Sequence, residues 1–188
     1  MGKFIFGIVF AVVLLLLIAV GTALLGFVPM RANTSPPKLE SQIAMGALDS
    51  SVERHAPHLS NPVPVTDDNL IDALKIYTMN CALCHGDVNR QPSALAHSLY
   101  PPPPNLITDP DDDPEWHIFY VIKNGIRYSG MPAWDKSLSS DDMWKLAALL
   151  TRIEKLPPGV QEYLKKTTSG APAVSPPIPD KGDHHDHH

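Results

Sequence analysis

Both cysteines of this 188-residue chain lie in one short stretch, CALCH, as Cys81 and Cys84, and His85 follows directly. Thiols and imidazoles bind metal ions, and a thiol pair can also form a disulfide or bond covalently to a cofactor. A disulfide would not require the histidine. A zinc site needs four ligands, and the chain has no second cysteine pair. A thioredoxin-like redox motif normally lies beside a βαβ pattern, which this sequence lacks.

The spacing C-x-x-C-H is the attachment signature of c-type haem. Each thiol adds to one vinyl group of the porphyrin, and the cysteine spacing matches the separation of the two vinyls. The adjacent histidine is then carried beneath the ring centre, where it ligates the iron. The sequence therefore predicts one covalent haem c, held by Cys81, Cys84 and His85.

A six-coordinate haem iron needs a second axial ligand. Met131 lies between Gly130 and Pro132 in NGIRYSGMPAW, outside any helical pattern, so its thioether is expected on a rigid loop. We predict Met131 as this ligand, with His97 and His117 as the alternatives. The other methionines lie beside the attachment motif, on a helical apolar face or ahead of the domain: Met79, Met143, Met1, Met30 and Met45.

Three helices are expected to position these residues, and because no run alternates like a strand, the predicted fold class is all-α. The first helix spans about residues 68–81 and begins after Thr66 or Asp67 as its N-cap. It carries Ala73 and Tyr77 on the same face as the first cysteine, at helical spacing.

The second helix has clear signals at both ends: Asp113 as N-cap, Pro114 at the first helical position and the Asn124-Gly125 pair as a stop. Its interior, EWHIFYVIK, is apolar on nearly all sides, which predicts a largely buried helix. The third helix, SSDDMWKLAALLTRI, begins at one of its two serines and is expected to end before the PPG at Pro157.

Composition divides the chain into four parts. Residues 1–28 are predicted to form a transmembrane anchor, because residues 4–28 carry no charge and make a helix of about 37 Å. The alternative is a cleaved signal peptide, whose apolar region is usually shorter, about 7–15 residues. Residues 29–66 are expected to be a Pro/Ser-rich tether, in which KLESQIAMGALDSSVERH can form a short helix. Residues 67–156 form the folded domain, and residues 157–188 are expected to be a disordered, His-rich tail.

Charge excludes one class of partner. The chain has a formal charge of -5, whereas a nucleic-acid partner requires a basic face. From residue 67 to 155 there are 13 acidic and eight basic side chains, and DPDDDPE at residues 109–115 is the densest acidic stretch. That stretch is interpreted as a solvated helix start or as a docking patch for a basic partner. The final DHHDHH is either a passive tail or a Zn²⁺ or Cu²⁺ ligand set.

The order of these motifs resembles the class I monohaem c-type cytochromes of the membrane-anchored bacterial type, similar to the haem-c domains of respiratory oxidases and dehydrogenases. The resemblance covers residues 67–156 and rests on CALCHG, LYPPPPNL, the second helix, NGIRYSGMPAW and the Trp-bearing third helix. It implies the class I cytochrome c fold, in which the first and last helices of the domain cross beside the haem.

The resemblance also implies roles for residues outside the attachment motif. The carbonyl of Pro103 or Pro104 would accept a hydrogen bond from the proximal histidine, and Leu106 would pack on the haem face. Trp134 and Arg127 would approach the haem propionates; the alternatives are core packing for Trp134 and a solvated charge for Arg127.

An iron with histidine and methionine ligands has no open site, so the predicted function is one-electron transfer rather than catalysis. The chain is expected to shuttle electrons between respiratory or photosynthetic complexes embedded in a bacterial inner membrane. One alternative is a fixed haem-c subunit of a larger oxidoreductase, and a third is a haem-based sensor or peroxidase. Because the thioethers form outside the cytoplasm, the haem domain is expected on the periplasmic or outer side, with the N-terminal helix in the lipid bilayer.

Replacement of both thiols, Cys81→Ser with Cys84→Ser, is expected to abolish covalent haem and with it the native fold. A domain of this size would rely on the cofactor for much of its core. Haem staining after denaturing electrophoresis and far-ultraviolet circular dichroism measure the two effects. A stable helical apoprotein would contradict the expected structural role of the haem.

Overall fold

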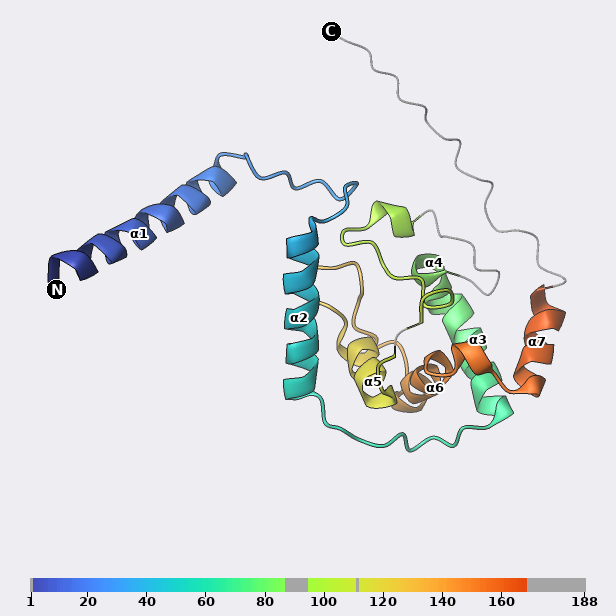
Figure 1. Cartoon of the computed structure of the whole chain (residues 1–188). Helices are drawn as coiled ribbons and strands as arrows, with labels where there is room; N and C mark the ends of the chain where they lie inside the picture. Colours follow the sequence, from blue (N-terminus) through green and yellow to red (C-terminus); the bar gives the residue numbers. More distant parts are fainter. Residues whose placement is uncertain (1, 87–94, 111, 169–188) are drawn as a thin grey trace, which may run out of the picture. The chain divides into compact units, whose positions relative to one another are not determined.

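The computed structural model describes residues 2–86, 95–110 and 112–168 (Figure 1). Every regular element within these ranges is a helix, which confirms the all-α prediction. The chain divides into two compact units between Ala32 and Asn33, and each is described by itself. The final DHHDHH, with its predicted metal-binding or passive role, lies outside the described residues.

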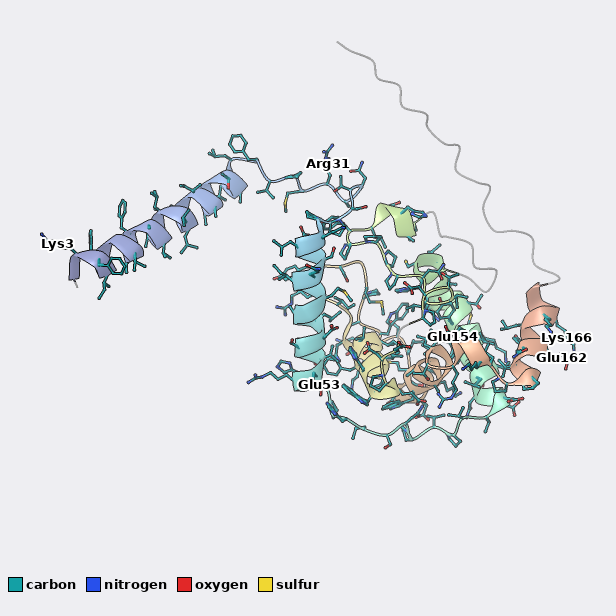
Figure 2. The ribbon with its side chains drawn as sticks, viewed as in Figure 1. Lys3, Arg31, Glu53, Glu154, Glu162 and Lys166 are labelled. Carbon is teal, nitrogen blue, oxygen red and sulfur yellow. The ribbon has the colours of Figure 1, made fainter. Side chains whose placement is uncertain are left out.

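The first unit contains α1 (Gly2–Leu24), which is apolar on all faces and has a mean hydropathy of 3.2 in its most apolar window. Its 23 residues make a helix about 35 Å long, compared with about 30 Å for a bilayer core. By length and composition α1 can cross a membrane, a criterion that a signal sequence also meets. Figure 2 labels Lys3 and Arg31, the charged residues at the two ends of the apolar run.

The expected tether is partly folded onto the second unit. It contains α2 (Lys38–His55), at the stretch where the sequence allows a short helix. α2 packs beside α5 (Glu115–Asn124), and Val52 on α2 is only 2% exposed (Figure 1). Within the stretch expected as a tether, α2 thus belongs to the second unit; Val52 is its buried residue, whereas Leu39, Ile43 and Met45 are exposed.

The core of the second unit is built on two helices, α3 (Asp67–Asn80) and α6 (Ser140–Leu150), which form the most extensive helix pair in the described chain. The hydroxyls of Thr66 and Ser139 cap them, each accepting the N–H three residues on, at 3.2 and 3.1 Å. Ala73 is fully buried in α3, and its small side chain permits a close approach of neighbouring helices.

The start of α5 differs from the prediction. Pro114 is the residue before the helix, and Asp113 does not cap it, because its carboxylate lies 2.9 Å from Nδ1 of His117. α5 is also less buried than its sequence suggests. Only His117 and Ile122 are buried, since the helix packs against α6 and α2 but keeps its remaining sides half-buried or exposed.

The chain beyond α6 is also folded. α6 ends at Leu150, and after a short turn α7 (Pro158–Thr168) follows, so the expected disorder from residue 157 onward is wrong for α7. Pro158 suits the first position of a helix, where a missing N–H costs nothing. α7 packs on α3 and buries Val160 completely. The described short helical turns are α4 (Ala82–His85), η1 (Ala96–Ser98) and η2 (Ile153–Lys155).

Val160→Ala removes two buried methyl groups from α7 and is expected to lower the free energy of unfolding by about 1.5–3 kcal/mol. Denaturant unfolding of the haem-loaded protein measures the change. Glu162→Ala is the matched control, because Glu162 is exposed on the same helix and pairs with Lys166 at 2.8 Å (Figure 2). Equal unfolding midpoints for the two variants would show that α7 contributes nothing to the core.

Candidate functional site

The CALCH residues form one tight turn at the end of α3. Cys81 follows the last residue of α3, and the N–H groups of Cys84 and His85 both bond to its carbonyl, at 3.0 and 2.9 Å. All three side chains are half-buried. Two thiols and one imidazole therefore come from a single helical turn, which is what attachment at two points beside one ligand requires.

The two cysteines are not joined in a disulfide. Burial raises the pKa of Cys81 to about 11, and the charge of neighbouring Cys84 adds to the shift. Among the described residues, no three His, Cys, Asp or Glu side chains are grouped to hold a metal ion. Covalent haem attachment needs only the two thiols and the adjacent histidine that this turn brings together, whereas a zinc site needs four ligands.

The imidazole of His85 is oriented by one hydrogen bond, with Nδ1 2.9 Å from the carbonyl oxygen of Pro104. A carbonyl only accepts, so Nδ1 carries the proton and Nε2 keeps its lone pair for a metal. Burial lowers the pKa of His85, and the bond to Pro104 partly opposes that shift. His85 is therefore neutral at pH 7, the form that ligates iron. Of the two expected prolines, Pro104 rather than Pro103 makes this bond.

The backbone at His85 is fixed from two further sides. The hydroxyl of Tyr77 on α3 lies 3.2 Å from the His85 carbonyl and 3.0 Å from the Gly86 carbonyl. The N–H of Leu106 donates to the same His85 carbonyl at 3.2 Å, and the Leu106 side chain packs against the core. The PPPPNL loop is thus bonded to the histidine through both its ring and its backbone.

Gly86 allows this loop to approach closely. Its φ is +88°, and a Cβ there would lie 2.7 Å from Oδ1 of Asn105. That oxygen organises the loop, accepting from the N–H groups of Ile107 at 3.0 Å and Thr108 at 3.2 Å. Glycine is therefore required after the histidine for two reasons, a left-handed backbone and a missing side chain.

Met131 lies in the loop after α5, which is closed by its own hydrogen bonds. The Met131 carbonyl accepts from the N–H of Ile126 at 3.1 Å, and the Met131 N–H donates to the Ser129 hydroxyl at 3.1 Å. That hydroxyl donates in turn to the Ile126 carbonyl at 2.8 Å. Gly125 has a φ of +65°, and a Cβ there would lie 2.6 Å from the nitrogen of Ala133. The half-buried Met131 side chain therefore stands on a braced backbone.

The alternative ligands lie in different surroundings. Met143 is buried in the core, and Met79 and His97 are exposed. His117 is buried, but its Nδ1 is engaged by Asp113, and it lines a surface hollow shared with residues of α2.

Two predicted site residues, Trp134 and Arg127, take no part in the hydrogen bonds around His85 and Met131 described above. The Trp134 side chain packs against the core, and the backbone N–H of Trp134 donates to the Ile122 carbonyl at 3.2 Å, which ties the Met131 loop to α5. Arg127 is exposed.

Three groups of the site were missed by sequence reasoning: the Tyr77 hydroxyl, Asn105 and Ser129. Asn105 had a usable signal, because an asparagine after a proline run readily bonds the backbone two residues on. Ser129 had the same kind of signal in a short turn before Gly130. Tyr77 was placed only on the helix face of the first cysteine, and its bonds to the attachment turn depend on the direction in which α3 ends.

Comparisons with known proteins cover part of the chain. Residues 69–150 match the family model described as "Cytochrome C oxidase, cbb3-type, subunit III". A solved structure of the Kuenenia stuttgartiensis reducing HAO-like protein complex aligns at 20% identity and a TM-score of 0.42, covering 52% of this chain and 50% of that chain. The chain thus spans about half the length of that similar chain. No curated protein sequence matches.

Tyr77→Phe removes the hydroxyl that reaches the carbonyls of His85 and Gly86. The expected loss in unfolding free energy is about 1–3 kcal/mol, because buried carbonyls lose a donor. Tyr128→Phe is the control, since Tyr128 is 90% exposed. Denaturant unfolding of the haem-loaded variants provides the comparison, and equal stability for both would contradict a bracing role for Tyr77.

Proposed function

We propose that residues 69–150, which match the cbb3-type subunit III family, form a c-type cytochrome domain with covalently bound haem c, and that the chain is a membrane-tethered one-electron carrier. One observation carries the proposal: the hydrogen bond of Nδ1 to Pro104, which presents Nε2 of His85 as a fixed ligand. When bound, haem c takes up or releases one electron at its iron.

The residues of this chain fit that group in a specific way. Cys81 and Cys84 would hold it covalently, and His85 and Met131 would ligate its iron. Two ligands on braced backbone leave no position for a substrate, so the chain itself performs no catalysis in this proposal. A thioether ligand raises the reduction potential, and a ligand set that does not change keeps reorganisation small.

The residues around the ligands would shape the environment of the haem. Leu106 is already packed against the core beside His85 and would cover a haem face. Trp134, on the Met131 loop, and the exposed Arg127 would lie toward the propionates, where a guanidinium can pair with a carboxylate. These roles follow the resemblance to the class I cytochromes.

The proposed location is a bacterial inner membrane, with α1 crossing the bilayer and the haem domain on the periplasmic or outer side. α1 supports this by its length and hydropathy. Covalent haem attachment supports the sidedness, because the thioethers form outside the cytoplasm. The electron donor and acceptor would be membrane-embedded redox complexes, and the acidic surface would favour basic docking sites.

A second function is favoured by the family description, which names a subunit of an oxidase. In that case the chain is a fixed haem-c subunit of a membrane oxidoreductase whose catalytic centre lies on other chains. Mild solubilisation distinguishes the two. A carrier purifies alone, whereas a subunit co-purifies with partners in fixed stoichiometry, and that result would replace the carrier proposal.

Met131→Ala is expected to leave haem covalently attached, because Cys81, Cys84 and His85 are untouched. The reduction potential should fall with the loss of the sulfur ligand. The reduced variant should bind carbon monoxide, which the parent does not. The measurements are potentiometric titration, carbon monoxide difference spectra and the sulfur-to-iron charge-transfer band of the oxidised protein.

The controls are Met143→Leu and Met79→Leu, which should keep the band and the potential, with less than about 1.5 kcal/mol lost at the buried site. Survival of the band in Met131→Ala would mean that another methionine is the ligand. A parent without the band would favour His97 or His117. Rapid carbon monoxide binding by the parent would favour a sensor or peroxidase.

A further inference from the structure

The chain between the membrane helix and the cytochrome domain is attached to that domain at several points. At the start of α2, the hydroxyl of Tyr100 donates to Oε1 of Glu40 at 2.5 Å. Toward its end, Val52 and Ala56 are buried, with α5 as the neighbouring helix. Polar and apolar contacts therefore hold both ends of α2.

The attachment continues after α2 ends. The imidazole of His58 stacks on Trp116 of α5, with ring centroids 4.0 Å apart and planes 13° apart. The Asn61 amide donates to Oε2 of Glu115 at 2.7 Å and to the Trp144 carbonyl at 3.2 Å. Glu115 is also paired with Arg152, so Asn61 joins a network that links α5 to the turn after α6.

These contacts leave a short connection. Between Leu24, the end of α1, and Lys38, the start of α2, lie the 13 residues 25–37, nearly all of them exposed. Thirteen residues extend to at most about 47 Å and span roughly 20 Å on average as a coil. If the chain were released up to Thr66, residues 25–66 would span roughly 36 Å on average. For comparison, a compact domain of the size of residues 38–168 has a radius of gyration of about 14 Å.

We propose that α2 and the following stretch to Asn61 are a fixed part of the haem domain, so that only residues 25–37 connect the domain to its anchor. The haem domain is then confined to a shell about one domain diameter deep at the bilayer surface. It fits a redox partner whose electron-transfer centre is exposed at the surface of the same membrane. This inference rests on the proposed function, because it takes α1 as the anchor.

The test uses the full-length, haem-loaded protein in phosphatidylcholine vesicles that carry a fluorescent headgroup, whose emission the haem quenches at short range. Val52→Asp places a charge in the α2 contact and should release α2, because an unpaired buried charge is strongly unfavourable. Ser51→Asp adds the same charge at the adjacent exposed position and is the control. A third variant inserts about 25 Gly/Ser residues after Ala32 and leaves α2 unchanged.

Quenching efficiency should fall about twofold or more in Val52→Asp and in the insertion variant, and should stay at the parent value in Ser51→Asp. Limited proteolysis of the parent should cut within residues 25–37 and spare residues 38–61, whereas Val52→Asp should also be cut within α2. The haem spectrum and thermal unfolding show whether each variant keeps its fold.

Three results would overturn the proposal. The first is cleavage of the parent within residues 38–61, which also decides the matter if Val52→Asp fails to fold. The second is unchanged quenching in a folded Val52→Asp, and the third is unchanged quenching in the insertion variant. Failure of the parent to incorporate stably into vesicles has a different meaning: it removes the anchor, and with it the proposed function.

Discussion

The hydrogen bond between Nδ1 of His85 and the Pro104 carbonyl decides which ring nitrogen keeps a lone pair for a metal. Much of the surrounding structure keeps this bond in place. Tyr77 on α3 and the N–H of Leu106 hold the His85 carbonyl, while Asn105 folds the proline loop against Gly86. A shift of α3 along its axis would therefore move His85 and its hydrogen-bond partner Pro104 together, because both are tied to the same turn.

The Met131 loop depends on a separate anchor. The Met131 carbonyl accepts from the backbone N–H of Ile126, which closes the loop. The backbone N–H of Trp134 donates to the Ile122 carbonyl, which fastens the loop to the last turn of α5. α5 in turn packs on α6, and α6 packs on α3, which leads into the attachment turn. The two proposed iron ligands thus belong to different local networks that meet only through helix packing. The helix core is what would fix the geometry between them.

Much of this could be predicted from the sequence, and the reasons for the failures are physical. The C-x-x-C-H spacing and the Thr66 cap are local signals, so they hold without knowledge of the fold. Asp113 was expected to cap α5, but a carboxylate one turn before an imidazole pairs with it instead. α7 was missed because its sequence, PGVQEYLKKTT, is mostly polar and gains its stability from burying Val160 against helices distant in sequence. The helix at α2 was expected from its sequence, but its neighbour α5 could not be named, because that contact joins segments distant in the chain.

The burial of Val52 on α2 and Val160 on α7 bears on how much of the chain is needed for the domain to fold. Residues 69–150 are what the family model recognises, yet α2 and α7, which cover the helices of that region, lie on either side of it in the chain. A gene fragment cut at those limits would encode the cysteines, His85 and Met131, but would leave α3 and α5 without covers that they have here. The gene segment that encodes the intact domain is therefore longer than residues 69–150, and it includes α2 and α7.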